Sequence, residues 1–535
     1  MNKVINLFKA KNKRLLICVG IISVILATCQ VVGHSIDTYL NLNGILGSIS
    51  LWGLAMIRII IYSIAIYFAV ILVVNLIEKI KPKENKEYRY LTDNKESFML
   101  AWTIILVMWF PYFIQYYPGL LSPDPVKQLL QITGEMNYTT NNPLLHTLII
   151  KFFYNIGEIC GSQELGIALY SITQMLVMSA IFAFIVYYMS KKKIPNTIRI
   201  LTLISFAIYP VHAIYSVTMW KDVLFGGVIA LYTIWIYEFT QNKLFIEKKK
   251  NVILFIILTI MIIMLTKNGI FVVLFLSPFL IIQRKDSIKK VLLMILSSVV
   301  LYFVIHASLV NIYNAESGEI KEALSIPMQQ LARIVTVHEN ELNEQELAQI
   351  KKFIQTNRIA ELYDPTISDP IKANFSNEAF MGNKLEFLSM WMKFLIKYPL
   401  DYIESFLCGN YGYWYPDAQN WAVTRSSDLG FKPILDTKIV PYIDSLIDRR
   451  DIPIITNLFS IGTNVWIMLI AFALCIYKKE YKLLIIFIPV ITIVLTSMAS
   501  PVFCEFRYVY GLFTTIPLLL AITYQKIKNC QRGRG

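Results

Sequence analysis

One carboxylate, Asp124, stands between two prolines in the segment YYPGLLSPDPVKQLLQ, which begins at Tyr116. Pro123 and Pro125 restrict the backbone on both sides of this acid and remove two hydrogen-bond donors. A carboxylate held where an apolar run meets water is placed to take a proton from a hydroxyl group. The same pattern fits a helix start, with Asp124 as the N-cap of a helix over residues 126–134. Both roles can hold together.

Two further polar side chains follow Asp124 in the same loop. Gln128 lies about one helical turn further on, and His146 follows the polar turn Asn141-Asn142-Pro143, which leads into a second amphipathic stretch. A lone histidine either serves as a structural hydrogen-bonding group or contacts a substrate. The sequence leaves both roles open for His146, and Gln128 can equally line a site or cover the helix.

Three cations stand at the ends of apolar runs that are far apart in the chain. They are Lys221 in TMWKDVLF, Lys267 in LTKNGI and Arg507 in CEFRYVY. Such cations can converge on one phosphate group, or each can extend separately to lipid head groups. Asp222 and Glu505, next to two of these cations, are either their ion-pair partners or contacts for a substrate.

The composition indicates the kind of element that must position these residues. The chain has 535 residues, of which 56% are hydrophobic and 16% charged, whereas soluble domains are about 25% charged. Its net charge of +14 is spread over short basic clusters between apolar runs, which indicates membrane topology and no nucleic-acid partner. The seven cysteines have neither paired nor metal-type spacing, so we expect neither a disulfide framework nor a zinc site.

The apolar runs predict an all-α polytopic integral membrane protein with about twelve transmembrane helices, since a span needs about 20 apolar residues. We expect a tight turn at Lys267-Asn268-Gly269, between two short helices. The predicted spans cover residues 15–35, 54–77, 98–117, 165–189, 198–214, 223–239, 252–265, 270–282, 291–306, 457–477, 483–499 and 508–524.

The basic clusters fall in alternate loops, which orients the predicted spans by the positive-inside rule. Both termini are then cytoplasmic, and Asp124 and the three cations lie on the outer face. We divide the chain into residues 1–97, with two helices and a cytoplasmic loop, and 98–306, a transmembrane core with an outer loop at 118–164. The remainder comprises a large helical outer segment at 307–456 and C-terminal helices at 457–535.

Within the large outer segment, residues 387–407 mix apolar side chains with charged ones such as Lys393 and Glu404. These charges argue against a span, and the pattern predicts amphipathic helices that lie on the outer leaflet. The aromatic segment NYGYWYPD follows at residues 410–417. Its rings could stack on a sugar or belong to an aromatic belt at the membrane interface.

PGLLSPD followed by NNPLLHT resembles the first outer loop of the GT-C class of membrane glycosyltransferases. It resembles more closely a largely uncharacterised bacterial family of polytopic membrane proteins, with the pattern PG-x-x-S-x-D, a glutamine, and then HP-x-x-HT. Asn141-Asn142 stands in place of the first histidines, so His146 is the one that remains. The motifs TMWKDVLF, LTKNGI, IPMQQLAR, NYGYWYPD and CEFRYVY extend the resemblance from about residue 98 onward. The order of these motifs is more specific than any one of them.

The resemblance implies a glycosyltransferase that uses a polyprenyl-phosphate-linked sugar, with inverting transfer on the outer face to an envelope glycan, polymer or protein. Asp124 would be the catalytic base, and no metal or other cofactor follows from the pattern. The donor phosphate would lie among Lys221, Lys267 and Arg507. Further substrate contacts are expected at Gln128, His146, Asp222, Arg333, Tyr413, Trp414, Glu505 and Tyr508.

Two other functions compete with this interpretation. A transporter or a flippase for lipid-linked sugars would have a similar number of spans, but the chain lacks two related halves. Its charged candidates also stand at the outer ends of spans, with Arg58 as the main exception. A non-catalytic partner of an envelope assembly complex would tolerate the loss of Asp124.

Overall fold

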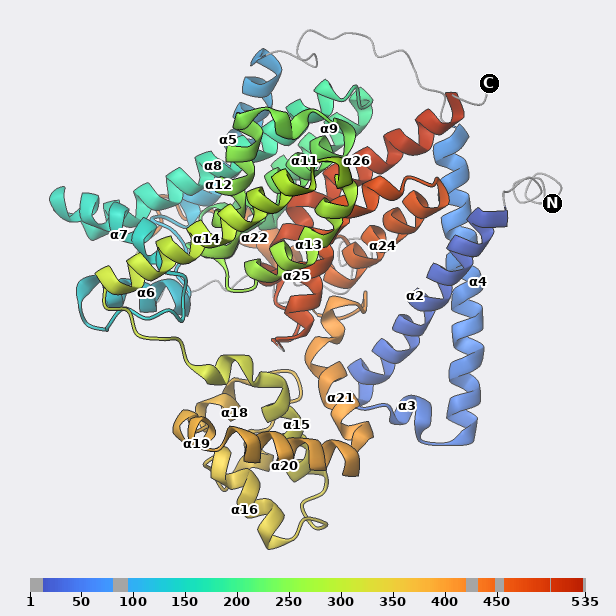
Figure 1. Ribbon diagram of the computed structural model, residues 1–535, viewed down its shortest axis with the longest axis vertical. Helices are drawn as coiled ribbons and strands as arrows, with labels where there is room; N and C mark the ends of the chain where they lie inside the picture. Colours follow the sequence, from blue (N-terminus) through green and yellow to red (C-terminus); the bar gives the residue numbers. More distant parts are fainter. Residues whose placement is uncertain (1–12, 80–94, 420–431, 448–456, 501, 533–535) are drawn as a thin grey trace.

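The computed structural model describes residues 13–79, 95–419, 432–447, 457–500 and 502–532. The regular structure within these ranges is helical apart from isolated β-bridges, which confirms the all-α prediction. A large helix bundle and a smaller group of helices beneath it are visible in Figure 1. We call residues 320–398 the helical subdomain.

Within the described residues, eight helices are long and apolar enough to cross a membrane. The chain is therefore a multi-pass membrane protein by helix length and hydropathy. The eight are α2 (Lys13–Tyr39), α4 (Ile49–Lys79), α5 (Lys95–Gln115), α8 (Gln163–Lys191), α11 (Lys221–Gln241), α14 (Ile288–Ile312), α25 (Ile488–Met498, extended by the 3-10 turn η6, Tyr481–Phe487) and α26 (Tyr510–Arg532, preceded by η7, Phe506–Val509).

A ninth span is formed if α9 (Asn196–Ile208) and α10 (Pro210–Ser216), which meet at an angle of 53°, count as one. Pro210 begins α10, and a proline at this position removes the donor that would continue the preceding helix. The prediction of about twelve spans is therefore wrong. Three of the predicted spans are helices of 17, 15 and 17 residues, namely α12 (Lys249–Leu265), α13 (Gly269–Gln283) and α24 (Ile461–Tyr477).

These three helices are short for identifiable reasons. Helix α12 ends at Leu265 and α13 begins at Gly269, so the predicted tight turn at Lys267 is confirmed. Helix α24 begins only after Ser460, whose hydroxyl caps it by accepting from the backbone N–H of Thr463. At 1.5 Å per residue, helices of this length reach about 22–26 Å, less than the roughly 30 Å hydrocarbon layer.

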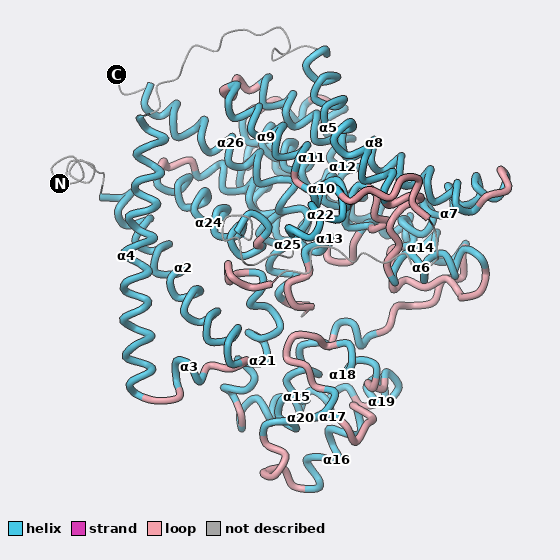
Figure 2. Tube along the Cα trace, turned by 180° about the vertical axis from the view of Figure 1, so that it is seen from behind, coloured by secondary structure: helices cyan, strands magenta, loops and turns pink. Residues whose placement is uncertain are grey.

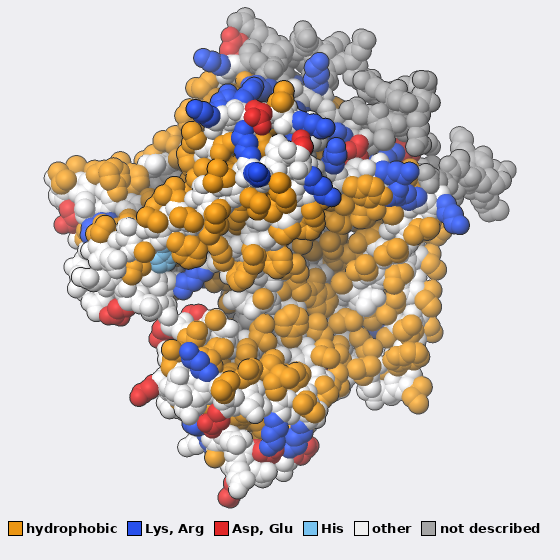
Figure 3. Space-filling view, in the orientation of Figure 1, with side chains coloured by type: hydrophobic (Ala, Val, Ile, Leu, Met, Phe, Trp, Pro, Cys, Tyr) orange, Lys and Arg blue, Asp and Glu red, His pale blue; other side chains and the backbone are white. Residues whose placement is uncertain are grey.

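The bundle presents a broad apolar surface, seen in Figure 3 as a belt of hydrophobic side chains. The start of α2 and the end of α26 lie at one end of the bundle, and the helical subdomain lies at the other. Figure 2 shows the same arrangement from behind. Helix α14 continues to Ile312, past the predicted boundary at residue 306.

The helical subdomain has a hydrophobic core of its own, built on side chains such as Met328, Phe353 and Phe394. Within α16, Asn343 and Glu346 form a complete capping box, which fixes the start of that helix. The helices of the subdomain are η4 (Ile320–Ala323), α15 (Ser325–Val337), α16 (Glu344–Phe353), α17 (Ile359–Leu362), α18 (Asp369–Ala373), α19 (Asn377–Gly382) and α20 (Lys384–Lys397).

The remaining described helices connect these parts. They are α3 (Asn43–Leu46), α6 (Pro123–Thr133), α7 (Leu144–Ile159), η2 (Phe245–Glu247), η3 (Lys285–Ser287), α21 (Pro399–Asn410), η5 (Tyr411–Tyr413) and α22 (Ile439–Ile447). Residues 387–407, predicted to be amphipathic, form α20 and α21, which are separated at Tyr398-Pro399.

Helix α20 has one buried and one exposed apolar face. Phe387, Met390 and Phe394 face the core of the subdomain, whereas Leu385 and Ile396 are 82% and 77% exposed. Further exposed apolar residues are Leu388 and Met392 on α20, and Leu400 and Ile403 on the following helix α21. Within each of these helices, the spacing of three or four residues places the exposed apolar side chains along one side, as an interfacial helix requires.

We expect a fluorophore attached at position 396 to contact lipid in nanodiscs. An Ile396→Cys variant labelled with an environment-sensitive dye should show blue-shifted emission and quenching by nitroxide-labelled lipids, because this face would lie in the head-group region. Gln345→Cys, on the exposed surface of α16, is the matched control, and exposed Cys160 is replaced by serine in both. Equal exposure to water at the two positions would contradict the prediction.

Candidate functional site

Asp124 lies in the first turn of α6, whose N-cap is Ser122. The prediction that Asp124 itself is the N-cap is therefore wrong, because the helix begins at Pro123, one residue before it. The helix ends at Thr133, one residue before the predicted end, and Gly134 caps it with a left-handed φ of 83° that glycine adopts without steric cost.

The carboxylate of Asp124 meets two of the three predicted cations. Its Oδ2 lies 3.3 Å from the Nζ of Lys221 and 3.0 Å from the Nη1 of Arg507. Lys221 begins α11, and Arg507 lies in η7 just before α26. Three segments far apart in the sequence thus contribute one charge each to a single cluster, which we call the Asp124 cluster.

Backbone pairing holds the segments of the cluster in place. The N–H of Leu120 donates to the carbonyl of Val217 at 2.9 Å, and the N–H of Met219 donates to the carbonyl of Leu120 at 3.0 Å. The indole Nε1 of Trp220 donates to the hydroxyl of Ser122. The loop that carries Asp124 is therefore fixed against the turn that carries Lys221.

The electrostatic surroundings keep Asp124 ionised. Burial alone would raise the pKa of its carboxyl group, but Lys221 and Arg507 lower it more through charge and hydrogen bonding, so the pKa lies well below its usual range. With both cations in place Asp124 is a charged but weak base. Removal of either cation would increase its basicity.

Arg507 makes a second set of contacts on its other side. Its Nη2 donates to the hydroxyl of Tyr508 at 3.0 Å, and its Nε lies 3.3 Å from a carboxylate oxygen of Glu505. The guanidinium also lies 5.1 Å from the centre of the Trp220 ring, a favourable cation–π distance. These contacts fix the guanidinium beside Asp124.

Two further acids lie around Arg507. Burial raises the pKa of Glu505 to about 7, against the opposing effect of Arg507. Asp222 is 4% exposed, and one of its carboxylate oxygens is buried without a hydrogen-bond partner in the part of the chain that the structure describes. Within the described residues, no group of three or more His, Cys, Asp or Glu side chains is arranged to hold a metal ion.

His146 and Gln128 belong to a buried hydrogen-bond network beneath the cluster. The Nδ1 of His146 lies 3.0 Å from the Oε1 of Gln128, and its Nε2 lies 2.8 Å from the hydroxyl of Tyr170. Tyr170 donates to Gln174, whose side-chain amide donates to the carbonyl of Thr218 at 2.7 Å. The network thus ties α6 and α7 to the turn before Lys221.

We expect the stability contributed by His146 to depend on pH. Burial, with a smaller effect of Lys221, lowers its pKa from 6.5 to about 3. Between these values the unfolded chain binds a proton that the folded chain excludes. The free energy of unfolding should therefore fall by about 1.4 kcal/mol per pH unit as pH drops below 6.5.

The measurement is the apparent Tm of the wild type and of His146→Gln from pH 7.5 to 4.5. The wild type should be more stable at neutral pH, and its advantage should shrink on acidification. A difference between the two proteins that stays constant across this range would contradict the assignment.

Three other predicted contacts are held by partners outside the Asp124 cluster, although Tyr413 also lies close to Glu505 and Tyr508. Arg333, in α15, pairs with Asp401 at 3.3 Å and with Glu404, and it has little exposed surface. Tyr413 is fully buried and donates its hydroxyl to the carbonyl of Val502 at 2.7 Å, so its ring has no exposed face on which a sugar could stack. The indole of Trp414 donates to Asn410 at 2.8 Å.

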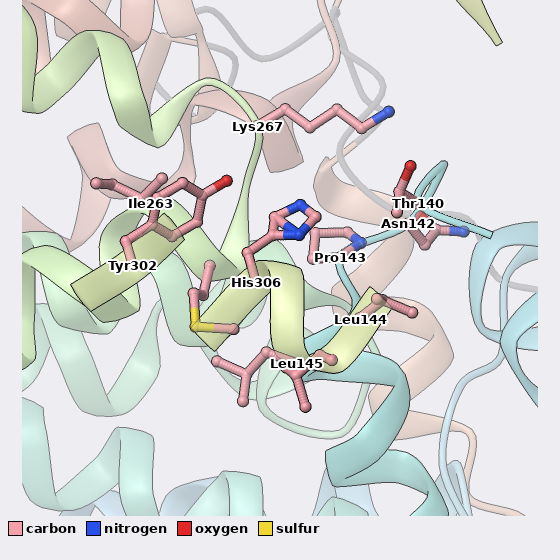
Figure 4. Close-up of a pocket in the computed structure, with 11 residues that line it drawn as sticks. Thr140, Asn142, Pro143, Leu144, Leu145, Ile263, Lys267, Tyr302 and His306 are labelled. Carbon is pink, nitrogen blue, oxygen red and sulfur yellow. The ribbon is translucent and has the colours of Figure 1, made fainter. Parts of the chain in front are cut away.

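The third predicted cation, Lys267, is at the edge of a pocket of about 210 Å³. In Figure 4 its ammonium group extends toward Thr140 and Asn142, with His306 and Tyr302 of α14 in the same view. Asn142 Oδ1 accepts from the Nζ of Lys221 at 3.0 Å. Desolvation lowers the pKa of Lys267, the charge of Glu322 opposes this shift, and nearby Lys221 adds to it.

Residues 130–534 match the model of a family of unknown function, DUF6020. The chain belongs to this family. No curated protein and no solved structure matches it. The region that matches DUF6020 contains Lys221, Lys267 and Arg507, and it begins after Asp124.

In this DUF6020 protein, several residues of the site could not be identified from the sequence. The sequence places Asn142 in a polar turn and at a position where the familial pattern has histidine, but it does not indicate the contact of its side chain with Lys221. For Trp220, the only indication in the sequence of a place in the site is its position next to Lys221 in TMWKD. Tyr302 and His306 lie four residues apart in an apolar run, a spacing that places both on one face of a helix.

Proposed function

We propose that this DUF6020 protein is a membrane glycosyltransferase of the GT-C type. It would transfer a sugar from a polyprenyl-phosphate donor to an envelope glycan, polymer or protein. The observation that carries the proposal is the Asp124 cluster, in which one carboxylate shares two cations, Lys221 and Arg507. A base and a pair of phosphate-binding groups are the parts that such a transfer needs.

In the proposed reaction, an acceptor hydroxyl gives its proton to Asp124, and its oxygen attacks the anomeric carbon of the donor. The bond between that carbon and the phosphate oxygen breaks, and the electron pair remains on the phosphate. Attack opposite to the leaving group inverts the anomeric configuration. The growing negative charge of the leaving phosphate is stabilised by Lys221 and Arg507.

The strongly lowered pKa of Asp124 gives the donor a second role. A phosphate that takes up Lys221 and Arg507 weakens their ion pairs with Asp124. The carboxylate then regains basicity only when a donor is bound. The cluster would thus be inactive toward water and hydroxyl groups until the donor arrives.

In this proposal the site faces the outer side of the membrane, and both termini are cytoplasmic. The distribution of basic residues in the sequence supports this orientation. The position of the helical subdomain at the end of the bundle opposite to the start of α2 and the end of α26 agrees with it. The subdomain would then contribute to acceptor selection on the outer side.

The test is reconstitution of the protein with a radiolabelled polyprenyl-phosphate sugar and a crude envelope fraction as acceptor. Transfer of label to the acceptor by the wild type, but not by Asp124→Asn, is the expected result. Equal transfer by the two proteins would reject Asp124 as the base. Movement of the donor across the bilayer without transfer would favour a flippase instead.

A further inference from the structure

The pocket beside Lys267 lies between three helices, and it differs from the Asp124 cluster in character. Its walls include Leu145 of α7, Ile263 of α12 and Leu309 of α14, whereas Lys267, Asn142, Thr140, Tyr302 and His306 supply polar groups. The pocket therefore combines hydrogen-bond donors and one cation with an apolar wall. A ligand that fits both halves carries an anionic group on an apolar chain.

Lys267 differs from the other two predicted cations because, among the described residues, no carboxylate forms an ion pair with its ammonium, although the charge of Glu322 acts on it from further away. Lys221 and Arg507 are both paired with Asp124. The side chain of Lys267 is exposed, and among the described residues its ammonium has no hydrogen bond or ion pair. Of the three, Lys267 alone can bind an anion without first giving up a carboxylate partner.

Asn142 connects the pocket to the Asp124 cluster. Its side chain lines the pocket, and its Oδ1 accepts from Lys221, which in turn pairs with Asp124. An anion that binds beside Asn142 is thus separated by one side chain from the cation of the cluster. It could pass from Lys267 to Lys221 with a short displacement.

The size and position of the pocket indicate how much of a ligand it holds. Pockets that enclose whole drug-sized ligands measure about 300–1,000 Å³, and this one measures about 210 Å³. Helix α14, which forms one wall, exposes Leu301, Phe303 and Val304 on its outer surface. A head group therefore fits inside, while a long chain would remain in the lipid around α14.

We propose that this pocket receives the phosphate head of a lipid, with Lys267 as its first anionic contact and the apolar chain in the bilayer beside α14. The assignment rests on the proposed use of a lipid-linked donor. It separates the roles of the three cations. Lys267 captures the donor, and Lys221 and Arg507 then hold its phosphate beside Asp124.

The experiment measures binding rather than transfer. The protein in nanodiscs is incubated with a polyprenyl phosphate that carries a photoreactive diazirine, and cross-linking is followed as the probe concentration rises. Lys267→Gln should weaken binding about 10- to 100-fold, since a hydrogen bond to a charged group contributes about 1.5–3 kcal/mol. Lys267→Arg should stay within a few-fold of the wild type.

The matched control is Lys127→Gln, because Lys127 is an exposed lysine on α6 that does not line the pocket. Its binding should equal that of the wild type. Neutral polyprenol should not compete with the probe, and inorganic phosphate should compete only weakly. Equal competition by inorganic phosphate and by unlabelled polyprenyl phosphate would reject a lipid ligand, and unchanged binding by Lys267→Gln would reject the site.

The two proposals can fail separately. If lipid phosphate binding depends on Lys267 but no sugar is transferred to any acceptor, the pocket stands and the glycosyltransferase proposal fails. If transfer depends on Asp124 while both binding and transfer are insensitive to Lys267, the glycosyltransferase proposal stands and the pocket assignment fails.

Discussion

Asp124→Asn is expected to lower the rate of sugar transfer by about 10²- to 10⁴-fold, the usual contribution of a general base. The amide is close to the carboxylate in size, but it cannot accept the proton of the acceptor hydroxyl. It also leaves Lys221 and Arg507 without the carboxylate that lies 3.3 and 3.0 Å from them. The measurement is single-turnover transfer from radiolabelled donor at saturating concentration.

The chain offers a close control for this change. Asp369 also precedes a proline in the first turn of a helix, α18, and its side chain is largely exposed in the helical subdomain. Asp369→Asn should leave the rate of transfer unchanged. Donor binding by Asp124→Asn should be as tight as in the wild type or tighter, because the amide no longer competes with phosphate for the two cations. A similar loss of rate in both variants would show that the effect is not specific to Asp124.

Arg507→Gln is expected to lower transfer and to change its dependence on pH. Without this guanidinium, one of the two cations that lower the pKa of Asp124 is lost, and that pKa rises toward its usual range. Asp124 must be ionised to act as a base, so the variant should lose activity on acidification at a higher pH than the wild type does. The measurement is kcat/KM for transfer from pH 4.5 to 8.

Two further variants separate charge from geometry. Arg507→Lys keeps the charge but loses the planar fork that contacts Asp124, Glu505 and Tyr508. On acidification, its kcat/KM should fall at a pH closer to that of the wild type. Its rate of transfer should still be reduced. Arg358→Gln, which removes an exposed arginine of the subdomain, should change neither property. If Arg507→Gln loses activity at the same acidic pH as the wild type, the role of Arg507 in lowering the pKa of Asp124 is contradicted.

Local sequence patterns were sufficient to predict those features of the fold that depend on residues close together in the chain. The excess of apolar side chains predicted a multi-pass membrane protein, because a lipid environment requires long uncharged helices. Gly269 marked the break between α12 and α13, and the segment around Asp124 marked the start of α6. The number of spans was overestimated because runs of 15 to 17 helical residues were counted in the same way as full-length ones.

Only the tertiary structure decided which charges meet. Asp124 and Arg507 are 383 positions apart, and nothing in either motif specifies the other as its partner. Their contact depends on how the bundle places η7 against the loop before α6. The same holds for Lys221, which the pairing of Leu120 with Val217 and Met219 brings to Asp124.

The structure also placed similar residue types in very different surroundings. Arg333 and Arg507 are both arginines beside two carboxylates, but Arg333 joins α15 to α21 within a separate group of charges. Tyr413 is buried under residues that come much later in the chain. The sequence by itself determined the membrane class of this protein and its candidate acid, Asp124, since both follow from residue types and short spacings. The fold determined which cations face that acid and which one has no ion pair within the described residues, because burial and ion pairing depend on contacts between segments distant in the chain.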